Sequence, residues 1–132
     1  MPARILVIED DEFSRELVRY LLDRQGYTVL EAADGGAGVQ MALIEHPDLV
    51  LCDLQMPVLN GYEVVQRLRG NPLWRAVPVV AVTAFSMPGD RDIALATGFD
   101  HYLTKPITPE IFVEQIAAFL PPGLRASSPP GA

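Results

Sequence analysis

The sequence is poor in several residue types, and each shortage excludes a class of protein. One of its 132 residues is cysteine, Cys52, so neither an internal disulfide nor a multi-cysteine zinc or iron–sulfur site can form. Lysine and arginine total 10 against 17 aspartates and glutamates. The resulting net charge of −7 opposes nucleic-acid binding, which needs clustered cations. Lysine occurs once, as Lys105, and the remaining cations are arginines. Any chemistry that requires lysine therefore has one available position.

Long hydrophobic runs are missing as well. No apolar stretch approaches the roughly 18–20 residues that a membrane span requires. The first four residues lead straight into the apolar segment 5–8 without a signal-peptide pattern. We therefore expect a soluble, cytoplasmic protein that has no membrane partner.

Hydrophobic residues nevertheless make up 49% of the chain, which indicates a folded core of one domain. Several short apolar runs lack the alternation of a half-exposed strand, which predicts strands buried in a parallel sheet: 5–8, 27–30, 49–52, 77–82 and 101–103. Segments with helical spacing lie between and after them: 13–24, 36–46, 61–69, 88–97 and 112–120. Strand and helix alternate five times, so we predict an α/β fold, a doubly wound parallel sheet with helices on both faces.

Glycine and proline punctuate these segments. A glycine in the left-handed conformation often ends a helix, and three glycines follow helical segments here: Gly26, Gly70 and Gly98. Thr108 is a predicted N-cap, with Pro109 at the first helical position. Residues 121–132 are rich in proline, glycine and serine and are predicted to be a flexible tail, which leaves 1–120 as the domain.

Polar side chains directly follow four of the predicted strands, at the edge where open α/β sheets bind ligands. Glu9 and Asp10 follow the first strand, and Asp53 follows the third. If these strands are neighbours, the three carboxylates converge and a cation must offset their repulsion. Mg²⁺ suits such oxygen ligands, Lys105 and Thr83 suit a phosphoryl group, and an aspartate can act as nucleophile. The pattern therefore predicts a pocket for magnesium-dependent phosphoryl chemistry.

Each of these residues also has an ordinary structural interpretation. Acidic residues after a strand often begin a helix, which we prefer for Asp11, as the cap, and for Glu12. For Asp10 both interpretations remain open. A lone aspartate after a strand is a common turn residue, and a lone threonine or lysine there is a cap or a solvated side chain. The functional interpretation is favoured because such residues fall at the same end of four different strands.

Four segments together resemble the receiver domain of bacterial two-component response regulators, of the single-domain or hybrid-kinase type. They are ILVIEDD at 5–11, DLQMPVLNG at 53–61, VTA at 82–84 and KP at 105–106. Their order and spacing match the family, and the resemblance covers about residues 4–120. It implies a flavodoxin-like (βα)5 fold with strand order 2-1-3-4-5.

The resemblance also implies roles for individual residues. Asp53 would accept a phosphoryl group from a sensor histidine kinase or a histidine phosphotransfer protein. Asp10, Asp53 and the backbone carbonyl of Gln55 would bind Mg²⁺, and Glu9 would contribute partly through water. These residues form the implied metal site.

The remaining implied roles concern the response to the phosphoryl group. Lys105 would pair with its oxygens, Thr83 would donate a hydroxyl to it, and Tyr102 would be the switch aromatic that turns inward. The Lys105–Pro106 peptide is expected to be cis. The output would be contact with a downstream protein target, and a homodimer through the fourth and fifth helices is a further candidate assembly.

We therefore expect a stand-alone phospho-accepting signalling module rather than an enzyme. A receiver segment of a hybrid histidine kinase is the alternative within the same class. A magnesium-dependent phosphohydrolase with an aspartate nucleophile is a different class, but it needs an acid/base residue where Gln55 stands. A flavodoxin-type flavin binder needs a phosphate loop after the first strand, where the four acidic residues 9–12 would repel the phosphate.

Overall fold

The structure, a computed structural model, describes residues 2–74, 76–84 and 87–121. The tail expected at 121–132 lies outside the described residues from position 122 onward. No helix within the described ranges is both long enough and apolar enough to cross a bilayer.

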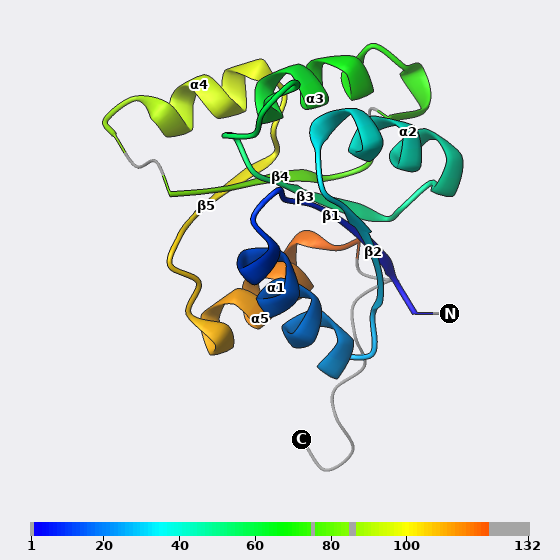
Figure 1. Ribbon diagram of the computed structural model, residues 1–132, viewed down its shortest axis with the longest axis vertical. Helices are drawn as coiled ribbons and strands as arrows, with labels where there is room; N and C mark the ends of the chain where they lie inside the picture. The colour runs from blue at the N-terminus through cyan, green and yellow to red at the C-terminus, as the bar shows by residue number, and fades with distance from the viewer. Residues whose placement is uncertain (1, 75, 85–86, 122–132) are drawn as a thin grey trace.

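Five parallel strands form one sheet in the order β2-β1-β3-β4-β5. They are β1 (Arg4–Ile8), β2 (Thr28–Ala32), β3 (Leu49–Cys52), β4 (Val79–Thr83) and β5 (His101–Thr104). The helices are α1 (Glu12–Arg24), α2 (Gly35–Glu45), α3 (Gly61–Arg69), α4 (Asp90–Thr97) and α5 (Pro109–Phe119). Figure 1 shows α1 and α5 on one face of the sheet and α2, α3 and α4 on the other. The predicted α/β class, flavodoxin-like (βα)5 architecture and strand order are confirmed.

The sheet is held by two cores, one on each face. Successive residues of a strand point to opposite faces, so Leu6 and Ile8 enter the core under α2 and α3, while Val7 enters the core under α1 and α5. All residues of β3 and β4 are buried, which explains why these segments lack polar alternation. The three central strands are therefore rigid supports for whatever follows them.

The structure corrects two details of the predicted boundaries. β2 spans Thr28–Ala32 rather than 27–30, because its pairing with β1 continues through the Val7–Glu31 and Ile8–Ala32 pairs, and arginines of α1 pair with the polar Glu31 side chain. Gly26 and Gly98 have positive φ as predicted, but the prediction for Gly70 is wrong: its φ is −67°. The chain keeps a right-handed turn there because it continues directly into the short 3₁₀ helix η1 (Pro72–Trp74).

The loop from β3 to α3 folds back tightly on the end of β3. A bond from the Leu59 N–H to the Pro57 carbonyl (2.8 Å) closes a three-residue turn, and Val58 between them has φ +71°. The Gly61 N–H then donates to the Leu54 carbonyl (3.1 Å). A Cβ at Gly61 would overlap the backbone carbonyl oxygen of Asp53 and lie 2.8 Å from the Leu54 Cα. The close approach of the two backbone segments therefore requires glycine.

This approach predicts a large effect for a single methyl group. Gly61→Ala should lower the free energy of unfolding by about 1–3 kcal/mol, because the methyl group meets backbone rather than a movable side chain. Gly36→Ala is the matched control: its nearest neighbour would be an Asp34 oxygen at 3.4 Å, and alanine favours the helix, so stability should hold or rise by up to about 1 kcal/mol. Urea unfolding followed by circular dichroism measures both. Equal stability of the two variants would contradict this account of the loop.

Candidate functional site

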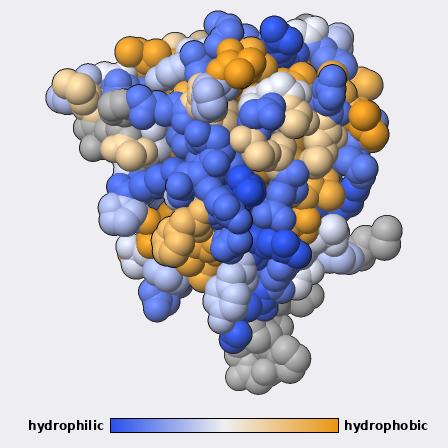
Figure 2. Space-filling view, in the orientation of Figure 1, coloured by the Kyte–Doolittle hydropathy of each residue, from blue (hydrophilic) through white to orange (hydrophobic). Residues whose placement is uncertain are grey.

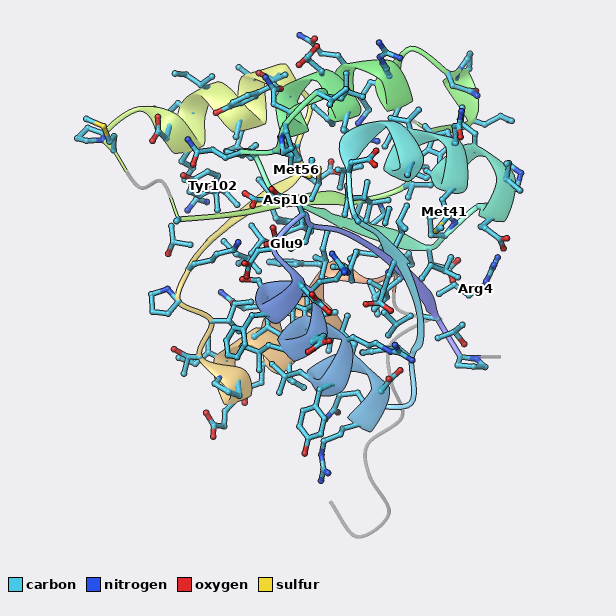
Figure 3. The ribbon with its side chains drawn as sticks, in the orientation of Figure 1. Arg4, Glu9, Asp10, Met41, Met56 and Tyr102 are labelled. Carbon is cyan, nitrogen blue, oxygen red and sulfur yellow. The ribbon has the colours of Figure 1, made fainter. Side chains whose placement is uncertain are left out.

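The ends of β1 and β3 lie side by side and bring acidic residues together. Ile8 and Cys52 are register partners, and the Asp53 N–H extends the ladder by donating to the Ile8 carbonyl (3.0 Å). The residues that follow the two strands, Glu9 and Asp53, are therefore neighbours. Figure 3 shows Glu9 and Asp10 at the end of β1, with Arg4 at the other end of the same strand.

Glu9, Asp10 and Asp53 form a group that we call the acidic cluster. One carboxylate oxygen from each lies within 4.8 Å of those of the other two. Glu9 and Asp53 are buried, with 5% and 8% of their surface exposed, whereas Asp10 is exposed. Among the described residues this is the one group of three or more potential metal ligands so arranged. Its oxygen donors, two buried and one facing solvent, fit a hard divalent cation such as Mg²⁺.

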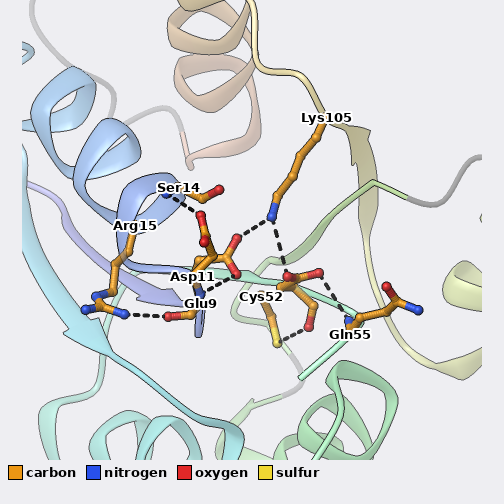
Figure 4. A network of polar contacts seen from close by, with 8 residues as sticks. Glu9, Asp11, Ser14, Arg15, Cys52, Gln55 and Lys105 are labelled. Atoms are coloured by element: carbon orange, nitrogen blue, oxygen red, sulfur yellow. Dashed lines mark hydrogen bonds and ion pairs between the residues drawn. The ribbon is translucent and has the colours of Figure 1, made fainter. Parts of the chain in front are cut away.

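Lys105 reaches into the acidic cluster from the end of β5 (Figure 4). Its Nζ lies 2.5 Å from Glu9 Oε1 and 3.4 Å from Asp53 Oδ2. The backbone aims it there, because the Lys105 N–H donates to the Thr83 carbonyl (2.8 Å) and so extends the β4–β5 pairing by one residue. The Lys105–Pro106 peptide is cis, as expected.

Burial and the charges around the cluster shift the pKa values of Glu9 and Lys105, the closest ion pair of the site. Burial is the main cause that raises the pKa of Glu9 to about 7; Asp53 raises it further, and Lys105 opposes the shift. Burial lowers the pKa of Lys105, but the hydrogen bond to Glu9 and the charge of Asp53 outweigh it, so the net pKa is raised. The lysine therefore stays charged, and the carboxylates share too little positive charge for all of them to ionise freely.

Every polar group of Glu9 has a partner. Its N–H donates to the Ala32 carbonyl (3.0 Å), and its carbonyl accepts from Arg15 Nη1 (2.9 Å). Its Oε2 accepts from the Asp11 N–H (3.3 Å), opposite the Oε1 that binds lysine. Asp11 is the N-cap of α1, as predicted, and accepts from the Ser14 N–H (2.8 Å). The contribution of Arg15 was not predicted, since nothing in the local sequence distinguishes it from the other arginines of α1.

Asp53 is held on its other side by the loop that follows it. The Gln55 N–H donates to Asp53 Oδ1 at 3.1 Å. The neighbouring Cys52 is fully buried and its thiol contacts the Asp53 carbonyl at 3.3 Å. Burial strongly raises the pKa of that thiol, with the charges of Asp53 and Glu9 adding to the effect. Cys52 is therefore a packing residue, and the reactive candidate at this strand end is the carboxylate.

Thr83 and Tyr102 lie on β4 and β5, the strands that lead toward Lys105. Thr83 is fully buried at the end of β4. Tyr102 is half-buried on β5, where it lies opposite Ala81 of β4. Tyr102 lines a groove of about 550 Å³ between the start of α4 and α5. Burial and the charge of Asp90 raise the pKa of the Tyr102 hydroxyl, so it stays neutral. Figure 2 shows hydrophilic residues in a band across the middle of the face viewed, with separate hydrophobic patches on either side.

The raised pKa of Glu9 predicts how stability depends on pH. Between about pH 4.5 and 7 the folded protein retains a proton on Glu9 that the unfolded chain has released. The free energy of unfolding should therefore fall as pH rises through this window, by about 1–3 kcal/mol, and level off above it. Glu9→Gln should lack this part of the fall, whereas Glu16→Gln, at an exposed position of α1, should keep it. Urea titrations in EDTA at several pH values measure this, and parallel pH curves for all three proteins would refute the assignment.

Comparisons with known proteins agree with this geometry. The sequence matches the family described as response regulator receiver domain over residues 5–117. The polar-differentiation response regulator DivK of Brucella anthropi is 36% identical over 120 residues, which span 91% of this chain and 98% of that protein. DivK of Brucella ovis is equally similar.

Solved structures carry the same fold. The chemotaxis protein CheY4 of Vibrio cholerae matches with a TM-score of 0.86 and 28% identity, over 91% of this chain and all of that one. The receiver domain of the sensor histidine kinase PA1611 from Pseudomonas aeruginosa matches with a TM-score of 0.83 and 31% identity, over 90% and 98% of the two chains. That structure holds a magnesium ion coordinated in its active-site cleft. From its sequence match and its fold, the chain belongs to the response regulator receiver domain family.

Proposed function

We propose that this chain accepts a phosphoryl group on Asp53 in a Mg²⁺-dependent reaction and transmits a signal through a change of its surface. The observation that carries the proposal is the buried Asp53 carboxylate, which lies beside Glu9 and Asp10 in the acidic cluster and 3.4 Å from the chain's single lysine. The donor would be the phosphohistidine of a sensor histidine kinase or of a histidine phosphotransfer protein. The receiver would comprise residues 1–120 and work in the cytoplasm, promoting only its own phosphorylation and dephosphorylation.

Four residues would hold the metal. Asp10 and Asp53 would supply carboxylate oxygens, Gln55 its backbone carbonyl, and Glu9 would contribute partly through water. When bound, Mg²⁺ supplies positive charge for the carboxylates and for the incoming phosphoryl oxygens. The clustering of hard oxygen donors supports this assignment, as does the excess of carboxylates over cations at the site.

The transfer itself would use the side chains that surround Asp53. A carboxylate oxygen of Asp53 attacks phosphorus, a new O–P bond forms, and the N–P bond to the donor histidine breaks with its electron pair on the imidazole. Lys105, 3.4 Å from Oδ2, is close enough to exchange part of its contact with Glu9 for the new phosphoryl oxygens. The Gln55 N–H keeps Oδ1 in place, which fixes the carboxylate plane during the attack.

The phosphoryl group would then act on Thr83 and Tyr102. Thr83 would move its hydroxyl toward the new dianion, and Tyr102 would turn inward from the groove that it lines. Because residues of α4, β5 and α5 share that groove, the face offered to a downstream protein, or to a second copy of the chain, would change.

The comparisons support two versions of this proposal. DivK proteins are described as response regulators and this chain spans nearly their whole length, which favours a stand-alone regulator. The similarity to the receiver of a sensor histidine kinase supports the second version, a receiver segment of a hybrid kinase. Gln55 cannot exchange a proton readily, which argues against the aspartate-dependent phosphohydrolase.

The proposal predicts a single covalent adduct. With Mg²⁺ and acetyl phosphate, intact-mass measurement should show one added phosphoryl group on the wild type and none on Asp53→Asn. Asp10→Asn should form the adduct at least about tenfold more slowly, since a metal ligand is lost. Asp23→Asn, an exposed change at the far end of α1, should behave like the wild type. An adduct that persists in Asp53→Asn, or steady turnover of phosphate esters, would contradict the proposal.

The switch can be tested separately from the adduct. In tyrosine-labelled protein, phosphorylation should shift the ring signals of Tyr102 and leave those of Tyr20, exposed on α1, in place. Lys105→Ala should still bind Mg²⁺, since the oxygen ligands remain, but the Tyr102 shift should be lost. Equal Tyr102 shifts in the phosphorylated wild type and phosphorylated Lys105→Ala would show that Lys105 does not couple the site to the switch.

A further inference from the structure

One side chain outside the acidic cluster is bonded directly to the turn that carries two of its members. Arg15 lies in the first part of α1, and its side chain is 19% exposed. Its Nη1 donates to the Glu9 carbonyl at 2.9 Å, and its Nε lies 3.6 Å from Glu31 Oε1 on β2. Figure 4 shows Arg15 and Lys105 approaching Glu9 from opposite sides. The arginine thus ties the end of β1 to the helix that follows it and to the neighbouring strand.

The bond from Arg15 acts on the peptide group that joins Glu9 to Asp10. The preceding peptide is already held, because the Glu9 N–H donates to the Ala32 carbonyl. Arg15 holds the next one by its oxygen, which sets the direction in which the chain leaves the strand. Since the carboxylates at this turn repel one another within 4.8 Å, loss of the Arg15 bond would release the Glu9 carbonyl and let Asp10 move away from Asp53.

Glu31 completes the arrangement from the sheet. It lies opposite Val7 in the β1–β2 register, and it also pairs with Arg19 (Nη1 to Oε2, 3.1 Å), one turn further along α1. Arg19 in addition pairs with Asp23 at 3.4 Å. The two arginines share a helix, a charge and a carboxylate partner. Arg15 is less exposed than Arg19 (19% against 57%), and its second contact is the Glu9 carbonyl, whereas that of Arg19 is Asp23.

We propose that Arg15 is a positioning residue for the metal and phosphoryl site: through the Glu9 carbonyl it holds Glu9 and Asp10 in the geometry that lets them act together with Asp53. This inference rests on the proposed function and deepens it. Arg15 touches neither the phosphoryl group nor the metal ligand atoms, and it acts through the backbone. The role needs the forked guanidinium, because the two contacts use different nitrogens, whereas a lysine has one.

Calorimetric titration with Mg²⁺ at a fixed pH tests the proposal. Arg15→Gln and Arg15→Lys should each weaken the apparent Mg²⁺ affinity about tenfold, as expected for loss of a group that orients metal ligands. Glu31→Gln should give a smaller loss, because the bond to the Glu9 carbonyl remains. Arg19→Gln, which leaves the Glu9 turn untouched, should stay within about twofold of the wild type.

The chain's single lysine supplies a readout that a purely structural role for Arg15 would not move. Protein labelled with ¹³C-lysine should give one Cε signal, from Lys105, whose environment is set by Glu9. Without metal, this signal should shift in Arg15→Gln and in Arg15→Lys and stay in place in Arg19→Gln. The readout needs neither Mg²⁺ nor phosphorylation.

The outcomes separate this inference from the proposed function. If Arg15→Gln matches Arg19→Gln in both Mg²⁺ affinity and the Lys105 signal, Arg15 is not a positioning residue, whether or not Asp53 accepts a phosphoryl group. Full recovery of both in Arg15→Lys would likewise overturn the inference, because charge alone would then suffice. Failure of wild-type Asp53 to form an adduct, with the Arg15 effects intact, would overturn the proposed function and leave the positioning role.

Discussion

The contact of the Lys105 ammonium with Glu9 at 2.5 Å and Asp53 at 3.4 Å organises the carboxyl edge of the sheet. Three carboxylates converge there because β1 and β3 are adjacent, and burial of two of them removes the solvent that would screen their repulsion. A single lysine cannot neutralise all three. The site therefore carries excess negative charge, which a proton on Glu9 reduces and a divalent cation would balance.

The rest of the fold serves to keep this unfavourable group in place. β1 and β3, which are buried on both faces over nearly their whole length, anchor the three carboxylates. The ladders run on beyond the strands, through the Asp53 N–H on one side and the Lys105 N–H on the other. The close backbone approach at Gly61 draws the loop after Asp53 back against β3. Packing elsewhere in the fold thus offsets the electrostatic repulsion among the carboxylates of the site. Such preorganisation is what the proposed phosphoryl transfer would require.

Much of the fold and of the site could be predicted from the sequence. The features that could not be predicted share one cause. The strands, their order and the residues at their carboxyl ends follow from apolar runs, from the alternation with helices and from resemblance to receivers. The closeness of Lys105 to Glu9 rather than to Asp53 could not be predicted, because side-chain reach depends on tertiary geometry. The same holds for Arg15, whose partners are a backbone carbonyl and a strand-edge glutamate. The prediction of a left-handed residue at Gly70 was wrong, because the 3₁₀ helix that follows keeps the backbone right-handed there.

If the acidic cluster is the proposed metal site, binding of a metal ion should displace the proton that Glu9 retains, and calorimetry can test this. Mg²⁺ titrations at pH 7 in buffers of different ionisation enthalpy report the number of protons released on binding. Because the pKa of Glu9 is raised to about 7, Mg²⁺ binding at this pH should release protons in the wild type and clearly fewer in Glu9→Gln. Binding of Mg²⁺ without proton release in the wild type, or the same release in both proteins, would contradict it.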